Sequence, residues 1–111
     1  NISAQEVEDV IDELDGVSES AVIPAPEEVR GEEVKALVMR THEEVTEREV
    51  VLQVGRTLAP YKVPRYVEFV ESFPRTPTER IRRVALADAE RERDDHGWDR
   101  EAEFPEWEEQ I

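Results

Sequence analysis

The chain has 111 residues and is strongly acidic, with 29 Asp and Glu against 14 Lys and Arg and a formal net charge of −15. This length fits one domain, and the absence of cysteine excludes disulfides and thiolate zinc sites. The charge disfavours nucleic acid as a partner. The chain also lacks a P-loop, a G-x-G-x-x-G or G-x-S-x-G motif, and a long apolar run that would predict a membrane span.

A helix and then a strand are predicted at the start of the chain. Ser3 and Glu6 form an S-x-x-E capping box, and Gly16 is a typical helix stop. Residues 17–23 are rich in apolar and small side chains and predict a strand, which Pro24 and Pro26 should end. The helix should bury one face, made of Val7, Val10, Ile11 and Leu14.

The middle of the chain predicts a second strand and a second helix. The charged segment "EEVRGEE", residues 27–33, indicates a turn before a nearly continuous apolar strand at residues 34–39. Thr46 and Glu49 form a second capping box, and the helix that they begin should end before Pro60.

The last third predicts a strand at residues 66–70 and a helix from about Ile81. The predicted fold class is therefore α+β, a small three-stranded sheet with helices packed on it and a short hairpin. Residues 88–111 hold eleven acids and three bases, so we expect an acidic, solvated extension whose removal leaves the fold intact. His42 and His96 are predicted to be surface residues rather than metal ligands.

A basic block interrupts this acidic chain. Between residues 56 and 83 there are seven basic residues against three acidic ones, and the block contains the segment "FPRTPTERIRR". Arginines grouped in this way suit a compact anion such as a phosphate, because the guanidinium fork matches its geometry. Pairing with the acidic surface is the alternative, and composition alone favours that alternative.

Four motifs in one order resemble the C-terminal domain of the adenylate-forming acyl-CoA synthetases. They are N-I-S-x-x-E-V-E at the start, G-E before the second strand, L-A-x-Y-K-V-P-R, and P-R-T-P-T at residues 74–78. The resemblance covers residues 1–87 and leaves 88–111 as an extension. It implies a piece of a longer enzyme, because the chain begins at Asn1 within a motif. The run W-D-R-E-A at residues 98–102 is similar to the carnitine- and crotonobetaine-CoA ligase branch.

The resemblance implies a mobile lid on an acid-thiol ligase. In that family a carboxylate and ATP form an acyl-adenylate and pyrophosphate, and coenzyme A then displaces AMP. The implied partners are an N-terminal adenylation domain of the same chain, which would hold Mg²⁺, and a carboxylic acid substrate. The isolated fragment should be inactive, and a cytoplasmic location is expected. The alternative is a non-catalytic acidic interaction domain that retains the lid fold.

Arg80 is the catalytic residue that the resemblance implies. The family usually has P-T-G-K with a catalytic lysine, whereas this chain has Pro77-Thr78-Glu79-Arg80. Arginine keeps the charge but is bulkier than lysine, and Glu79 lacks the conformational freedom of glycine. The same residues also form a T-x-x-E capping box, so they are also predicted to do no more than begin a helix.

Arg30 and Gly31 are the predicted coenzyme A contacts, since the equivalent loop of the family approaches coenzyme A during thioester formation. Arg30 would pair with a phosphate, and Gly31 would let the backbone come close. A plain hairpin turn is the alternative. For Lys62 and Arg65, pairing with nearby acids is favoured over contact with a nucleotide.

Overall fold

Four strands form one sheet in the computed structural model, which describes residues 3–78 and 80–111. The strands β1 (Val17–Glu27) and β2 (Gly31–Arg40) form an antiparallel hairpin, and β3 (Tyr66–Phe69) runs parallel to β2. The short strand β4 (Trp98–Asp99) pairs antiparallel with β3. The α+β class is confirmed, and the predicted three strands gain a fourth from the C-terminal segment.

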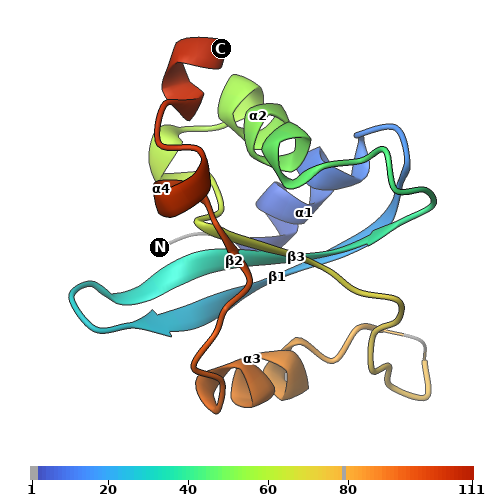
Figure 1. Ribbon diagram of the computed structural model, residues 1–111. Helices are drawn as coiled ribbons and strands as arrows, with labels where there is room; N and C mark the ends of the chain where they lie inside the picture. Colours follow the sequence, from blue (N-terminus) through green and yellow to red (C-terminus); the bar gives the residue numbers. More distant parts are fainter. Residues whose placement is uncertain (1–2, 79) are drawn as a thin grey trace.

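Helices cover both faces of this sheet (Figure 1). α1 (Ala4–Asp12) and α2 (Glu47–Thr57) lie on one face, and α3 (Arg83–Arg91) lies on the other. Two 3₁₀ turns, η1 (Pro60–Lys62) and η2 (Trp107–Gln110), and the short α4 (Arg100–Glu103) complete the described elements. Both predicted caps are present, because the side chains of Ser3 and Thr46 accept bonds from the amides of Glu6 and Glu49.

The side chains of the strands alternate between two buried clusters, as the pleat of a sheet requires. The larger cluster joins the sheet to α1 and α2 and includes Val22, Ala36, Val38 and Val67. The smaller cluster lies towards α3 and consists of Ala21, Ile23, Leu37, Phe73 and Ala87. The chain therefore has core on both sides of a single sheet.

The strand β1 continues past the prolines that were predicted to end it. Pro24 pairs with Val34 and Pro26 with Glu32 before the strand ends at Glu27. β1 is an edge strand of the sheet. A proline nitrogen that faces the open edge loses no ladder hydrogen bond, so both prolines are tolerated.

The C-terminal segment is not the solvated extension that was predicted. Phe104 and Trp107 are only 3% and 5% exposed and belong to the larger cluster. The guanidinium of Arg48 lies 4.5 Å from the centre of the Phe104 ring. The prediction failed because it relied on the acidic composition of the whole segment. Two aromatic side chains bury enough apolar area to order a short polar segment.

Candidate functional site

Residues 74–82, which we call the arginine loop, form a narrow loop between the sheet and α3 (Figure 1). Arg75 and Ile81 pair as an isolated antiparallel bridge. The amide of Thr76 donates to the carbonyl of Arg80 at 2.8 Å, and the amide of Arg82 donates to the carbonyl of Pro74 at 2.9 Å. These bonds bring the two sides of the loop together and leave its tip projecting from the body.

The predicted helix start at Pro77 is wrong. α3 begins at Arg83, after Arg82 as its N-cap residue. The Thr76 hydroxyl accepts a bond from the Arg80 amide at 3.1 Å, so it closes the loop instead of capping a helix. Glu79, which was predicted to complete the capping box, lies outside the described residues.

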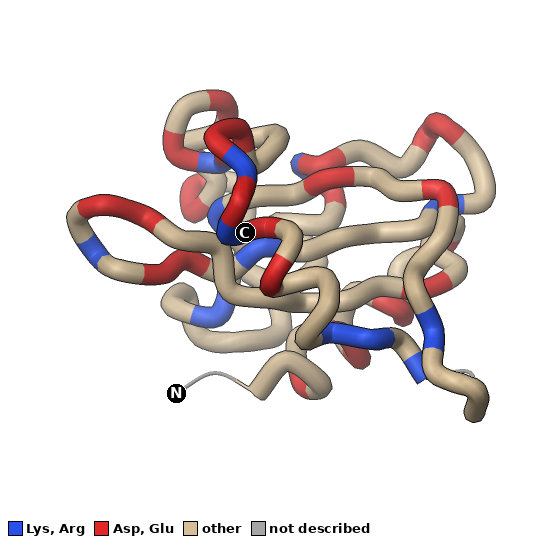
Figure 2. The backbone as a smooth tube through the Cα atoms, turned by 90° about the horizontal axis from the view of Figure 1, so that it is seen from below, with Lys and Arg blue, Asp and Glu red and all other residues tan. Residues whose placement is uncertain are grey.

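Arg80 is exposed at this tip. Within residues 3–78 and 80–111, its side chain makes no hydrogen bond or ion pair, and the same holds for Arg82. Figure 2 shows that the basic positions of this segment gather at one corner of the molecule. Both guanidinium groups are exposed, and an exposed guanidinium without a carboxylate partner among these residues is the chemistry that binds a polyphosphate.

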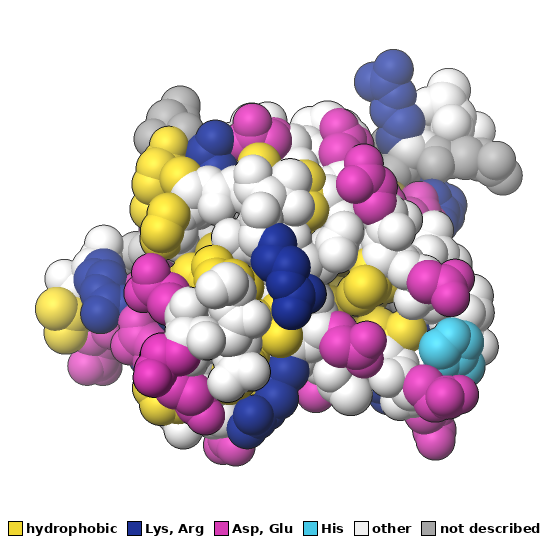
Figure 3. Space-filling model, turned by 90° about the horizontal axis from the view of Figure 1, so that it is seen from above, with side chains coloured by type: hydrophobic (Ala, Val, Ile, Leu, Met, Phe, Trp, Pro, Cys, Tyr) yellow, Lys and Arg dark blue, Asp and Glu magenta, His cyan; other side chains and the backbone are white. Residues whose placement is uncertain are grey.

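Ion pairing accounts for the rest of the basic block except Arg56, which is exposed. On the face over α2, acidic and basic side chains lie among one another, as Figure 3 shows. Pairing with nearby acids is therefore confirmed for Lys62 and Arg65. The four pairs are Lys62 with Glu6, Arg65 with Asp99, Arg75 with Glu19, and Arg83 with Glu8.

Arg30 and Gly31 lie at the turn between β1 and β2, as predicted. The Glu27 carboxylate accepts bonds from the amides of Val29 at 3.1 Å and Arg30 at 2.6 Å, and these bonds lower the pKa of Glu27. Gly31 has a φ of +87°, and no atom lies within 4 Å of a Cβ built there. Glycine is therefore needed here for its backbone conformation and not for space.

The charge of Arg30 is compensated, whereas Arg80 has no ion-pair partner among the described residues. The guanidinium of Arg30 donates hydrogen bonds to the carboxylates of Glu33 and Glu101, each at 2.5 Å, and these bonds raise the pKa of Arg30. The side chain is still 54% exposed. The hairpin turn and the arginine loop lie at opposite ends of the sheet, so the structure does not bring these two predicted sites together (Figure 1).

A buried charge cluster was missed by the sequence analysis. Lys35 is completely buried, and its ammonium contacts Glu68 at 2.7 Å and Glu90 at 2.8 Å. The Nδ1 atom of His96 also contacts Glu90, and Arg93 contacts Glu68 at 2.5 Å. The signal in the sequence was a lysine inside an apolar strand, which requires a buried partner.

The prediction of a surface position is consequently wrong for His96. Its side chain is 11% exposed, and its ring centre lies 5.3 Å from that of Tyr66. The cluster joins β2, β3, α3 and the segment after α3 through opposite charges. It has a structural explanation, because each buried charge has at least one partner of opposite sign.

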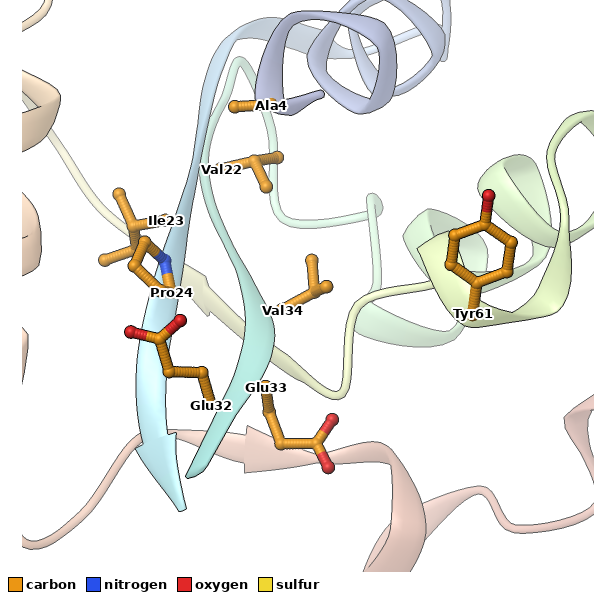
Figure 4. Close-up of a pocket in the computed structure, with 8 residues that line it drawn as sticks. All are labelled: Ala4, Val22, Ile23, Pro24, Glu32, Glu33, Val34 and Tyr61. Atoms are coloured by element: carbon orange, nitrogen blue, oxygen red, sulfur yellow. The ribbon is translucent and has the colours of Figure 1, made fainter. Parts of the chain in front are cut away.

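A shallow groove lies between the start of α1, the hairpin and η1 (Figure 4). Its volume is about 510 Å³. Tyr61 stands on one side, and Glu32 and Glu33 lie at the other end. The remaining lining is apolar and consists of Ala4, Val22, Ile23, Pro24 and Val34.

The described part of the chain offers neither a metal-binding cluster nor a membrane-spanning helix. No group of three or more His, Cys, Asp or Glu side chains there is arranged to hold a metal ion. None of the helices there has the length and apolar character needed to cross a bilayer.

The family model described as the AMP-binding enzyme C-terminal domain matches residues 6–80. The chain belongs to this family. It is 43% identical over 86 residues to the long-chain-fatty-acid–CoA ligase FadD13 of Mycobacterium tuberculosis. The aligned region covers 78% of this chain and 17% of that relative. The region that the family model matches includes the arginine loop up to Arg80.

Solved structures give the same answer for the fold. A fatty acyl CoA synthetase of M. tuberculosis superposes with a TM-score of 0.76 at 42% identity, over 80% of this chain and 18% of that one. ATP-bound MatB of Rhodopseudomonas palustris superposes with a TM-score of 0.77 at 33% identity, over 83% of this chain and 18% of that one. The chain thus spans less than one fifth of the length of these relatives, and it corresponds to a C-terminal domain of the AMP-binding enzyme family.

Proposed function

We propose that this domain is the mobile lid of an ATP-dependent acyl-CoA synthetase, and that Arg80 acts in its adenylation step. The exposed guanidinium of Arg80, which has no partner among the described residues, carries this proposal. A carboxylate and the α-phosphate of ATP repel each other, and a positive charge between them stabilises the transition state. Arg80 stands at the position that the family usually fills with lysine.

The substrates of the whole protein follow from the same proposal. It would join a carboxylic acid to coenzyme A, with ATP giving AMP and pyrophosphate. The acid and Mg²⁺ would bind mainly to an N-terminal adenylation domain of the same protein. We propose a cytoplasmic location, and we propose that the family domain ends near residue 87. The likeness to carnitine-CoA ligases stays a prediction.

The hairpin turn would serve the second step. Arg30 is half exposed and lies at the other end of the sheet from Arg80. A rotation of the lid could therefore present either end to one active centre, with Arg30 and Gly31 near coenzyme A in the second orientation. The separation of the two sites supports a two-orientation mechanism.

Variants of Arg80 in the full-length protein test the proposal. Arg80→Ala should slow acyl-adenylate formation by about 10²–10³-fold, the usual cost of one positioned charge at a transition state. Thioester formation from supplied acyl-adenylate should be nearly unchanged. Arg80→Lys should keep most activity, because it retains the positive charge.

Arg56→Ala is the matched control, since Arg56 is also an exposed arginine of the basic block but lies in α2, outside the arginine loop. It should affect adenylation much less than Arg80→Ala does. Equal adenylation by the wild type and Arg80→Ala would contradict the catalytic role. Such a result would favour a non-catalytic interaction domain that retains the lid fold.

A further inference from the structure

Two arginine–carboxylate pairs hold the two ends of the arginine loop. At its start, both terminal nitrogens of Arg75 bond the carboxylate of Glu19, one of them at 3.1 Å. Immediately after its end, Arg83 bonds the carboxylate of Glu8 through Nε at 2.7 Å and through a terminal nitrogen. Such two-bond pairs restrict orientation as well as distance.

The pair at the end of the loop is anchored in the core. Glu8 is only 3% exposed, although it carries a charge. One of its oxygens also accepts a bond from the amide of Val22 at 2.7 Å. A single carboxylate therefore connects α1, β1 and the first residue of α3.

The pair at the start of the loop depends on the alternation of β1. Glu19 precedes Ala21 and Ile23 on the strand, and those two side chains face α3 in the smaller cluster. Residues two apart on a strand share a face, so Glu19 is directed towards the loop. Phe73, buried in the same cluster, fixes the chain just before the loop begins.

Between these anchors, bonds among the described residues restrain the loop. The bridge of Arg75 with Ile81 joins its two sides. The bond from the Arg80 amide to the Thr76 hydroxyl fixes the backbone at the tip. Arg80 is thus exposed in its side chain but attached to a restrained backbone.

We infer that Glu8 and Glu19 are positioning residues, which hold the two ends of the arginine loop and thereby set the direction in which Arg80 is presented. The inference rests on the proposed function for its catalytic consequence. The two carboxylates also compensate the charges of Arg75 and Arg83. Holding a catalytic group in one geometry before reaction is a large source of rate enhancement.

Hydrogen exchange in the 111-residue chain tests the restraint without any assay of catalysis. Glu19→Gln should accelerate exchange of the Thr76 and Arg82 amides by about two- to fivefold, as expected for a partly exposed ion pair. Glu8→Gln should accelerate it by about tenfold or more, because hydrogen bonds to a buried charge are stronger. Glutamine keeps an oxygen acceptor for the Val22 amide, so the substitution changes mainly the charge.

Glu71→Gln is the matched control. Glu71 is an exposed carboxylate near the loop, and it has no partner among the residues that the structure describes. Its substitution should leave exchange in the loop unchanged. The core amides of α2, such as those of Val50 and Val54, report global unfolding and should keep their rates in Glu19→Gln.

A double-mutant cycle in the full-length enzyme tests the catalytic consequence. Glu19→Gln should lower acyl-adenylate formation and spare thioester formation from supplied adenylate. The same substitution should have almost no effect in the Arg80→Ala background, because Glu19 acts through Arg80.

The outcomes separate this inference from the proposed function. Unchanged exchange in both glutamine variants, or equal acceleration in the loop and α2, would overturn the restraint. Independent effects of Glu19 and Arg80 on adenylation would overturn the positioning role. If Arg80→Ala leaves adenylation unchanged, Arg80 has no catalytic role and needs no positioning for catalysis. The hydrogen-exchange result would still decide whether the two carboxylates hold the loop.

Discussion

Arginine residues of one basic block have different roles because their neighbours differ. Arg65 bonds Asp99 at 3.1 and 3.2 Å and lies within 4 Å of three further carboxylates, so it organises the sheet edge. Arg80 has no such neighbour among the described residues. Composition shows only that the block is basic, whereas the contacts identify which charge remains available.

Replacement of Arg30 should separate the two half-reactions of the full-length enzyme. Because Arg30 lies at the opposite end of the sheet from Arg80, Arg30→Ala should weaken thioester formation and spare adenylation. Steady-state kinetics with coenzyme A as the varied substrate would show this as a raised KM. Glu28→Gln, an exposed change in the same turn, is the control. Equal loss of both half-reactions would indicate a structural role for Arg30.

Gly55 shows how one neighbour can reverse an ordinary propensity. In an exposed helix, replacing glycine with alanine should stabilise by about 1 kcal/mol. Here a Cβ would lie 2.6 Å from a ring carbon of Trp107. We therefore expect Gly55→Ala to lower the melting temperature. In a Trp107→Ala background the same substitution should raise it, and a stabilising Gly55→Ala in the wild type would contradict this packing.

At the scale of elements, the C-terminal segment belongs to the fold. β4 adds to β3, and Phe104 and Trp107 fill the larger cluster. Gly97 allows this path with a φ of +93°. The segment also reaches the hairpin turn, since Asp99 and Glu101 contact Arg65 and Arg30. The same segment that was predicted to be dispensable therefore supports the predicted coenzyme A site.

Deletion of residues 98–111 should strongly destabilise the domain, contrary to the expectation from composition. Removing a buried aromatic side chain typically costs about 3–5 kcal/mol, and the whole domain has only about 5–15 kcal/mol of stability. Thermal unfolding should lose most of its cooperativity or shift down by many degrees. The double variant Glu106→Gln and Glu109→Gln, at exposed positions, should melt like the wild type. A truncated chain with an unchanged melting curve would show that the aromatic contacts contribute little.

At the scale of the whole molecule, opposite charges are distributed so that the buried ones cancel. Burial alone would raise the pKa of Glu68, but hydrogen bonds from Lys35 and Arg93 outweigh it and lower that pKa below 4.5. Burial alone would likewise raise the pKa of Asp99, but hydrogen bonds, chiefly those from Arg65, outweigh burial and lower that pKa. Asp12 shows the opposite case, because burial raises its pKa.

The lowered pKa of Glu68 predicts a pH-dependent contribution to stability. A carboxylate whose folded pKa is depressed stabilises the fold above its unfolded pKa of about 4.5, and this contribution is lost as the pH falls through the folded pKa. The stability difference between the wild type and Glu68→Gln should therefore be constant above about pH 5.5 and shrink below pH 4.5. Urea unfolding at several pH values measures it, and a difference that grows with acidity would contradict the assignment.

The sequence by itself determined the local elements and the family. The N-cap at Ser3, the capping box of Thr46 and Glu49, the apolar face of α1 and the turn at Gly31 depend on residues close together in the chain. Their patterns are therefore visible in the printed sequence. The four motifs located Arg80 and Arg30 for the same reason. The predicted helix start at Pro77 failed because the Thr76 hydroxyl instead closes the arginine loop.

Only the tertiary structure decided which charges are compensated and which apolar residues are buried. The pairs of Glu8 with Arg83 and of Glu19 with Arg75 join residues 75 and 56 positions apart. Trp107 meets Gly55, and Lys35 meets Glu90, over similar separations. Coulomb attraction and hydrophobic burial depend on distance in space, which local patterns in a sequence do not encode. For that reason the arginine loop could be found from its motif, but the carboxylates that hold it could not.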